Sequence, residues 1–244
     1  MALCTVHFSS ASIGKQDTMN VILPKGRGPF PVLYLLHGLS DDYSIWQRRT
    51  SIERYVEDLR LIVVMPDTHR FFYVNDARPG GPAYEDHITK DVVGFVDRTF
   101  PTIRTRGGRA VAGLSMGGYG ALMLAFRHVG MFSAAVSHSG AIQFPGGPRV
   151  NLPDVVALAE ALPRRRYDLF ALAREHAARR RKLALRFDCG TEDGLLEVNR
   201  RFHAHLAKLR IDHEYAEHPG GHDWGYWDRH VRETLAFVVR HLAG

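Results

Sequence analysis

The sequence predicts an α/β protein with a mostly parallel sheet and helices on both of its faces. Short apolar runs rich in β-branched residues alternate along the chain with longer amphipathic segments. Several of these runs are continuously apolar, which is typical of strands that are buried on both faces. The 244 residues are 45% hydrophobic and 24% charged, so the main state is folded and one α/β unit accounts for the length. We therefore expect a single domain over residues 1–244.

Eight short segments have the pattern of strands. Thr5–Phe8 and Met19–Leu23 predict an antiparallel hairpin that leads into the sheet. Val32–Leu36 is a continuous apolar run between Pro31 and the turn His37-Gly38, and predicts a buried strand. The remaining predicted strands are Leu61–Met65, Ala110–Ala112, Ala134–Ser137, Leu183–Phe187 and Glu214–Ala216.

Longer segments between these strands predict helices. They are Ile45–Asp58, Ile88–Phe100, Met116–His128, Leu195–Leu209 and Trp227–Leu242. The region Pro145–Lys182 departs from this alternation, because it is helical, Arg-rich and opens with a Pro-Gly-Gly-Pro turn. It is too short to build a core of its own, so we interpret residues 145–182 as a cap-like insertion over a site.

Composition argues against several classes of partner. The net charge is +6 and 27 of the 32 basic residues are Arg, but tight clusters occur only at Arg164–Arg166 and Arg179–Arg181. No aromatic residues interleave with them, so we expect no nucleic-acid binding. The longest apolar runs are strand-sized and no basic leader precedes them, so we expect no membrane insertion and a cytoplasmic location. Two cysteines, Cys4 and Cys189, predict free thiols rather than a disulfide framework.

The segment Gly113-Leu114-Ser115-Met116-Gly117 fits the G-x-S-x-G pattern of a nucleophilic serine. Such a serine occupies a sharp strand-to-helix turn, where flanking glycines avoid steric clashes. The predicted strand before Ser115 and the predicted helix after it supply that context. The first N–H groups of the helix then favour a developing oxyanion. We expect Ser115 to be the nucleophile.

A nucleophilic serine needs a base and an orienting carboxylate, and in this fold they follow it in the order acid, then histidine. The loop Gly190–Gly194 follows a predicted strand and contains two acidic residues. Asp193 is the preferred acid. Glu192 is its neighbouring alternative, and Asp188 is expected to lie within the strand.

The candidate base lies in the Gly-rich segment His218–Trp224. His222 precedes the last predicted helix, where an imidazole can reach Ser115. His218 lies at the end of the preceding strand and is the structural alternative.

The oxyanion hole needs two N–H donors. The residue after the nucleophile, Met116, supplies one, and Leu39 in the loop after the first long strand supplies the other. Trp46 follows that loop, and we expect it to form a wall of the substrate site.

No histidine pattern of a zinc site and no phosphate-binding glycine loop is present, so we expect no metal and no cofactor. The pair His203 and His205 would point in divergent directions on a helix.

Four sequence blocks resemble the esterase D family of α/β-hydrolases, in order and over nearly the whole chain. They are Leu35–Asp42 with Trp46, Ala112–Ala121, Cys189–Asp193, and Gly220–Trp224 with Tyr226–Asp228 behind it. The resemblance is strongest to the small tributyrin and acetyl esterases, and S-formylglutathione hydrolases are relatives. It implies Ser115, Asp193 and His222 as a catalytic triad, with Leu39 and Met116 as oxyanion donors.

The sequence thus predicts a serine carboxylesterase that acts on small-molecule short-chain acyl esters, acetyl to butyryl. A thioester hydrolase of the S-formylglutathione type and a carbohydrate acetyl or feruloyl esterase remain open, as does acyl transfer to a carbohydrate. A non-enzymatic binding protein on the same scaffold is the alternative outside enzymes. We also regard a homo-oligomer as compatible with the sequence.

Overall fold

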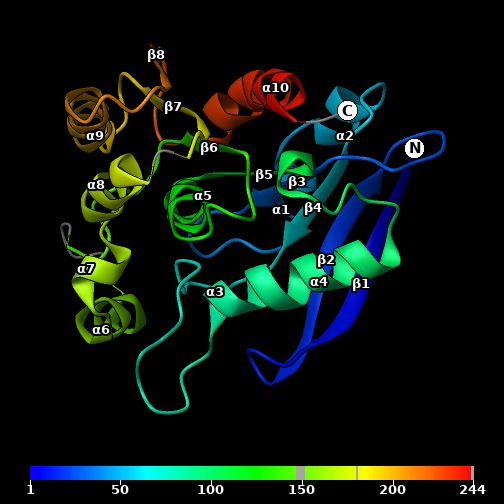
Figure 1. Cartoon of the computed structure of the whole chain (residues 1–244), viewed down its shortest axis with the longest axis horizontal. Helices are drawn as coiled ribbons and strands as arrows, with labels where there is room; N and C mark the ends of the chain where they lie inside the picture. The colour runs from blue at the N-terminus through cyan, green and yellow to red at the C-terminus, as the bar shows by residue number, and fades with distance from the viewer. Residues whose placement is uncertain (147–151, 180, 243–244) are drawn as a thin grey trace.

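The computed structural model describes residues 1–146, 152–179 and 181–242, whose eight strands lie in one sheet. The strands are β1 Ala2–Ser10, β2 Lys15–Leu23, β3 Val32–Leu36, β4 Ile62–Pro66, β5 Arg109–Leu114, β6 Ala134–His138, β7 Ala184–Gly190 and β8 Glu214–His218. Their order across the sheet is β1-β2-β4-β3-β5-β6-β7-β8. The hairpin β1–β2 is antiparallel and β2 pairs antiparallel with β4, whereas all other pairs are parallel (Figure 1). The predicted lead-in hairpin and mostly parallel sheet are confirmed.

Helices cover both faces of the sheet (Figure 1). They are α1 Ile45–Arg49, α2 Ile52–Val56, α3 Tyr84–Asp86, the π-helix η1 His87–Val92, α4 Val93–Thr99, α5 Met116–Arg127, α6 Pro153–Ala161, α7 Arg164–Tyr167, α8 Leu169–Ala178, α9 Leu196–Lys208 and α10 Trp224–His241; a 3-10 turn, η2, spans Arg106–Gly108. Alternate strand residues point to opposite faces, so β3 sends Tyr34 to one apolar layer and Leu35 to the other. The first layer includes residues of α4, α5, α8 and α9, and the second includes residues of α1, α2 and α10.

The predicted helix Ile45–Asp58 is two short helices, α1 and α2. The backbone adopts an extended conformation at Thr50, whose hydroxyl donates a hydrogen bond to the carbonyl of Trp46. The next residue, Ser51, donates its N–H to Asp228 on α10 at 2.9 Å. Side-chain hydrogen bonds of the Thr50 kind compete with the continuation of a helix. The hydrogen bond from Ser51 to Asp228 then holds the chain in the turn between α1 and α2.

The last helix begins three residues earlier than predicted. Asp223 caps α10 by accepting a hydrogen bond from the N–H of Tyr226 at 3.0 Å. An N-cap side chain satisfies one of the free first-turn N–H groups, so the helix starts at Trp224, close behind His222.

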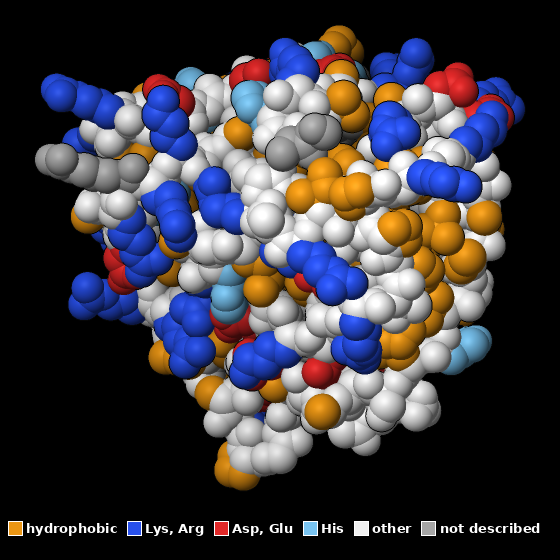
Figure 2. Space-filling model, turned by 45° about the vertical axis from the view of Figure 1, so that its right-hand side comes forward, with side chains coloured by type: hydrophobic (Ala, Val, Ile, Leu, Met, Phe, Trp, Pro, Cys, Tyr) orange, Lys and Arg blue, Asp and Glu red, His pale blue; other side chains and the backbone are white. Residues whose placement is uncertain are grey.

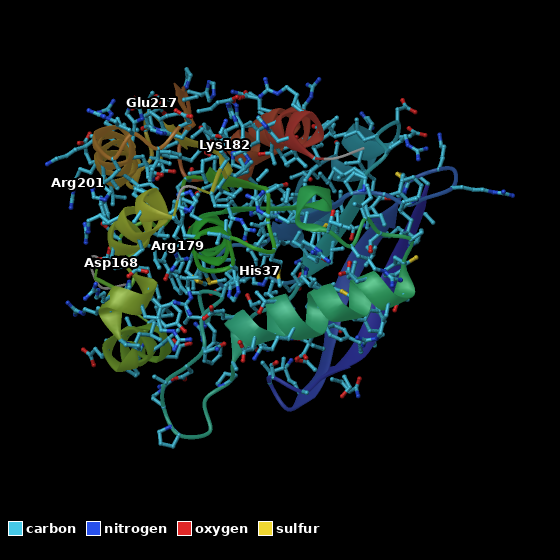
Figure 3. All side chains as sticks on the ribbon, in the orientation of Figure 1. His37, Asp168, Arg179, Lys182, Arg201 and Glu217 are labelled. Atoms are coloured by element: carbon cyan, nitrogen blue, oxygen red, sulfur yellow. The ribbon has the colours of Figure 1, made fainter. Side chains whose placement is uncertain are left out.

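The region predicted as a cap contributes α6, α7 and α8. Residues 147–151 and 180, which include part of the Pro-Gly-Gly-Pro turn and the middle of the Arg179–Arg181 cluster, lie outside the described residues. Asp168, at the junction of α7 and α8, caps α8 through the N–H of Ala171 at 3.0 Å (Figure 3). The buried Tyr167 anchors the region, because its hydroxyl donates to Glu85 at 3.0 Å and its carbonyl accepts from Tyr119 at 2.8 Å.

Lys and Arg side chains are spread over the face drawn in Figure 2, with fewer Asp and Glu side chains among them. Within residues 1–146, 152–179 and 181–242, none of the helices has both the length and the apolar composition needed to span a bilayer.

Candidate active site

Ser115 lies in the turn between β5 and α5. Its backbone has φ 52° and ψ −114°, a conformation that non-glycine residues rarely adopt. The turn needs glycine on both sides, because a Cβ on Gly113 would lie 2.5 Å from the backbone of Gly117. A Cβ on Gly117 would lie 2.6 Å from the carbonyl oxygens of Leu36 and His37. The sequence pattern and the backbone geometry therefore agree on a strained serine at a sharp turn.

His222 lies within hydrogen-bonding distance of Ser115. Its Nε2 is 3.0 Å from the Ser115 Oγ, and its Nδ1 is 2.8 Å from Oδ2 of Asp193. The loop after β8 carries His222, and the indole of Trp227 on α10 meets the imidazole edge to face, with ring centroids 4.9 Å apart. This packing fixes the plane of the ring, so that its two nitrogens face the serine and the carboxylate.

Asp193 has a fully buried side chain in the loop after β7. Burial alone raises the pKa of its carboxyl group, but hydrogen bonds from His222 and from the N–H of Leu195, at 2.8 Å, outweigh burial and lower the pKa below its ordinary value. The carboxylate is therefore ionised at neutral pH. One oxygen faces His222 and the other is held by the backbone.

The three alternative residues lie elsewhere. Glu192 is exposed. Asp188 is buried within β7, as expected, where it accepts hydrogen bonds from His138 Nδ1 at 2.9 Å and from the Tyr226 hydroxyl at 2.9 Å. His218 faces Glu233 on α10 at 3.6 Å. The structure thus brings together Ser115, His222 and Asp193.

Leu39 and Met116 both line the cavity that contains Ser115. Met116 is the first residue of α5, so its N–H belongs to the first turn and has no acceptor within the helix. Leu39 lies in the loop after β3, two residues beyond His37. The two residues predicted as oxyanion donors therefore border the same cavity as the serine.

Side chains that the sequence did not identify hold the loop of Leu39 in place. The Nε2 of buried His37 accepts the N–H of Thr68 at 3.0 Å, so Nδ1 carries the proton and donates to the carbonyl of Gly38 at 2.8 Å. Tyr73 donates its hydroxyl to the carbonyl of His37 at 2.9 Å. Burial lowers the pKa of His37, which keeps the ring neutral in the interior (Figure 3). The His-Gly pair predicted a turn, but no sequence signal points to Tyr73.

An apolar cavity of about 400 Å³ adjoins Ser115. Phe72 and Phe144 stack on one another at its wall, with centroids 3.8 Å apart and planes at 9°. Helix α6 of the 145–182 region contributes Val155, Val156 and Ala159. Besides Ser115, the polar lining residues are Gln143, Glu160 and Arg164. A site this size encloses most of a small ligand.

Trp46 does not line this cavity. The residue is 1% exposed and belongs to the core layer on the α10 side, where it meets Trp224 edge to face. Its indole N–H donates to the carbonyl of Leu36 at 3.1 Å. The expectation that Trp46 forms a substrate wall is therefore wrong. The residue supports the strand end that precedes the Leu39 loop, and the walls come from Phe72 and Phe144.

Comparisons with known sequences point to one family. The family model Esterase matches residues 10–238. An esterase of Mycobacterium tuberculosis is 32% identical over 251 residues, which cover 88% of this chain and 54% of that protein. The chain thus spans about half the length of this curated relative. An acetyl esterase of Caldicellulosiruptor saccharolyticus is 25% identical over 264 residues, covering 98% of this chain and 99% of that one.

Solved structures share the fold. A fluorophosphonate-binding serine hydrolase of Staphylococcus aureus matches with a TM-score of 0.91 and 30% identity over 98% of both chains. The S-formylglutathione hydrolase of Staphylococcus aureus matches with a TM-score of 0.87 and 29% identity, again over 98% of both. The chain therefore has the α/β-hydrolase fold, which confirms the predicted fold class.

Proposed function

Because the chain belongs to the Esterase family, whose members are carboxylic ester hydrolases, we propose that it hydrolyses short-chain acyl esters, acetyl to butyryl. We assign Ser115 as nucleophile, His222 as general base and Asp193 as the carboxylate that orients it. The observation that carries the proposal is the pair of hydrogen bonds that joins these three side chains, 3.0 Å from Ser115 to His222 and 2.8 Å from His222 to Asp193.

The first half of the reaction forms an acyl-enzyme. Ser115 Oγ attacks the ester carbonyl while its proton passes to Nε2 of His222. Asp193 holds the proton of Nδ1 and stabilises the imidazolium. Collapse of the tetrahedral intermediate expels the alcohol, which takes the proton from Nε2. Water then attacks the acyl-enzyme by the same proton route, and the carboxylic acid leaves with Ser115 restored.

The negative charge on the attacked oxygen needs donors that are in place beforehand. We assign the N–H groups of Met116 and Leu39 to this role. The positive end of the α5 dipole lies behind Met116 and favours the same charge. The hydrogen bonds of His37 and Tyr73 hold the Leu39 loop in place before substrate arrives.

The cavity supports a short acyl chain. Each buried CH₂ contributes about 0.8 kcal/mol, or roughly fourfold in kcat/KM. This gain ends when the chain meets the stacked rings of Phe72 and Phe144, after which steric overlap costs energy. The acetyl esterase among the relatives supports the same size range.

The test is a series of p-nitrophenyl acetate, butyrate, octanoate and palmitate at matched solubility. We expect kcat/KM to be greatest between two and four acyl carbons and to fall sharply by eight. Ser115→Ala supplies the background rate, and Glu192→Gln is the matched active control. A maximum at octanoate or beyond would overturn the short-chain assignment and would mean that α6 borders a longer groove.

A thioester hydrolase is the second candidate, because an S-formylglutathione hydrolase shares the fold over nearly the whole chain. Turnover of S-formylglutathione at a kcat/KM above that of p-nitrophenyl acetate would favour it. Acetylated and feruloylated sugars test the carbohydrate alternatives. A binding protein without catalysis would give neither turnover nor a fluorophosphonate adduct on Ser115.

We further propose a cytoplasmic location, which two free cysteines, Cys4 and Cys189, support. Cell fractionation tests it. A homo-oligomer stays a prediction. Light scattering of the purified protein tests it by measuring the molar mass in solution.

A further inference from the structure

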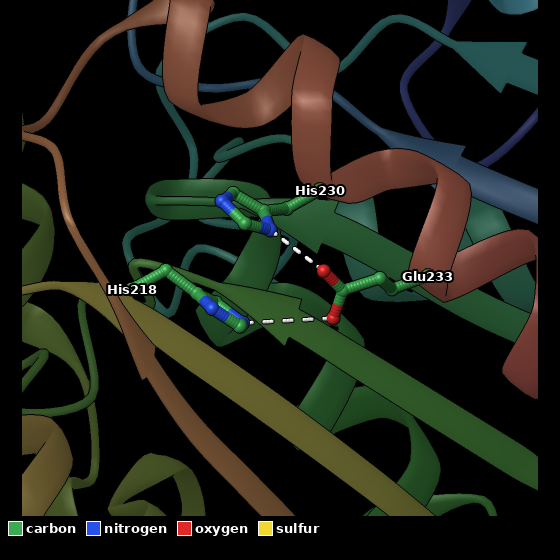
Figure 4. Close-up of side chains that lie close together, drawn as sticks. All are labelled: His218, His230 and Glu233. Atoms are coloured by element: carbon green, nitrogen blue, oxygen red, sulfur yellow. Dashed lines mark hydrogen bonds and ion pairs between the residues drawn. The ribbon is translucent and has the colours of Figure 1, made fainter.

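Behind the loop that carries His222, three potential ligand side chains converge from β8 and α10 (Figure 4). His218 ends β8, and His230 and Glu233 lie one turn apart on α10. Nδ1 of His230 is 2.8 Å from Oε1 of Glu233, and Nε2 of His218 is 3.6 Å from Oε2. One ligand atom from each residue lies within 4.8 Å of the other two.

We propose that His218, His230 and Glu233 bind a divalent transition-metal ion of the zinc type. Zinc takes imidazole nitrogen and carboxylate oxygen at about 2.0–2.2 Å, which places neighbouring ligand atoms roughly 3–3.6 Å apart. The 3.6 Å between His218 and Glu233 lies at the upper end of this range. The 2.8 Å between His230 and Glu233 is a hydrogen bond and lies below the range, so the carboxylate must shift when an ion binds. Water completes such a three-residue site.

The nitrogen of His218 that faces Glu233 has no hydrogen bond of its own. This Nε2 is buried and has no hydrogen-bond partner within the described part of the chain. Nε2 of His230 is likewise buried without a hydrogen-bond partner among the described residues, whereas its Nδ1 is hydrogen-bonded to Glu233. Each histidine thus has one buried ring nitrogen that no hydrogen bond occupies.

Binding requires one ring to turn. The two imidazoles are stacked, with centroids 4.2 Å apart and planes at 14°, and near-parallel rings cannot direct their lone pairs at one ion. His218 is the ring free to turn, because its side chain is 29% exposed whereas that of His230 is 6% exposed. Metal binding therefore breaks the stack and leaves His230 in place.

The positive charge of Arg186 beside Glu233 influences which metal ions this site would bind. Its guanidinium pairs with Oε2 of Glu233 and, at 3.1 Å, with Glu214. It therefore orients the Glu233 carboxylate with Oε1 toward His230, but its charge weakens the attraction for any cation. Ions that depend on oxygen ligands, such as Mg²⁺ and Ca²⁺, lose most of their binding, whereas Zn²⁺, Ni²⁺ and Cu²⁺ retain the two imidazoles.

No metal is expected from the sequence, because the three residues form none of the spaced motifs. They come together only because α10, which packs against β5, β6 and β7, places His230 and Glu233 next to the end of β8. A bound ion would join the end of the strand to the helix on either side of residues 219–223, which carry His222. The proposal does not depend on the esterase assignment.

The experiment titrates chelator-treated protein with ZnCl₂ by calorimetry and follows Tm at each metal concentration. We expect one Zn²⁺ per chain and a rise in Tm, since a ligand that binds only the folded state stabilises it. Loss of a residue that only supports a metal ligand lowers metal affinity about 10–100-fold. We therefore expect His218→Gln and Glu233→Gln each to lower the affinity for Zn²⁺ by at least this factor. His241→Gln, an exposed position on the same helix, is the matched control and should bind as wild type does.

His222→Gln separates this site from the candidate catalytic one, and we expect it to bind Zn²⁺ normally. Loss of binding in His222→Gln alone would place the ion at the catalytic histidine and overturn the proposal. No saturable binding, or equal affinity in His218→Gln, would overturn it as well. If Glu233→Gln does not fold because its ion pair with Arg186 is lost, the Zn²⁺ affinity of His218→Gln still tests the proposal.

Discussion

Asp193→Asn tests the proposed catalytic arrangement most sharply, because the backbone fixes the orientation of the new amide. Oδ1 of Asp193 accepts the N–H of Leu195 at 2.8 Å, so the amide oxygen of the substituted side chain keeps that place. The amide NH₂ then faces Nδ1 of His222, which must give up its proton to accept the hydrogen bond. The proton moves to Nε2, where it blocks transfer from Ser115.

The expected loss follows from the wrong tautomer. The equivalent exchange in a serine protease lowers kcat by about 10⁴-fold, which at about 1.4 kcal/mol per tenfold is roughly 5 kcal/mol of transition-state stabilisation. We expect a loss of that order here, because the Asp193 side chain is fully buried and water cannot take the place of its carboxylate. KM should change little, since Asp193 does not contact substrate.

The assay measures kcat and KM for p-nitrophenyl butyrate, with thermal unfolding to verify that the variant is folded. Glu192→Gln removes a neighbouring, exposed carboxylate and should keep activity within about twofold, as surface changes away from the site do. A kcat for Asp193→Asn within tenfold of wild type would refute the assignment. If Glu192→Gln lost activity instead, the acid would be Glu192.

Three shorter predictions rest on other contacts. Ser115→Ala should lower kcat by several powers of ten with Tm unchanged, and should abolish labelling by a fluorophosphonate probe; residual labelling at another residue would contradict this. The pKa of Glu85 is lowered to about 2 by His128 and Arg127, which outweigh the effect of burial. Its folded pKa lies below the unfolded value of 4.5, so its stabilisation is complete above pH 4.5 and is lost as pH falls toward 2. Tm should fall over that range in wild type and less in Glu85→Gln. Trp46→Phe should cost about 1 kcal/mol through the lost hydrogen bond to Leu36, without changing the preferred acyl length.

The sheet and the strained turn that carries the candidate nucleophile could be predicted because their signals are local. The continuous apolar runs Val32–Leu36 and Leu61–Met65 match β3 and β4 within one residue, since a strand buried on both faces has no polar position. Ser115 could be located because its strained turn requires the two glycines beside it. Asp193 and His222 could be predicted from the order of acid and then histidine after the serine in this fold, and from their places in loops that follow predicted strands.

The features that sequence could not predict depend on partners far along the chain. The break between α1 and α2 depends on Asp228, 177 residues after Ser51. Whether Trp46 faces a cavity or the core depends on Trp224, which has no signature in the sequence around Trp46. The cluster of His218, His230 and Glu233 likewise exists only once α10 has packed against the sheet. In each case the local pattern fits two structures, and tertiary packing selects one.

The positions of the candidate catalytic residues along the chain also have a consequence for the kinetics of folding. Ser115 and His222 are 107 residues apart, and Asp193 lies 29 residues before His222. Contacts between such distant residues form late, because the loops between them must close first. Helices give circular dichroism signal as soon as they form. Hydrolysis requires in addition that β6, β7 and β8 have extended the sheet from β5 and that α10 has packed against it. In a refolding experiment, recovery of hydrolysis should therefore lag behind recovery of ellipticity, and the lag measures how long the last third of the chain takes to join the sheet.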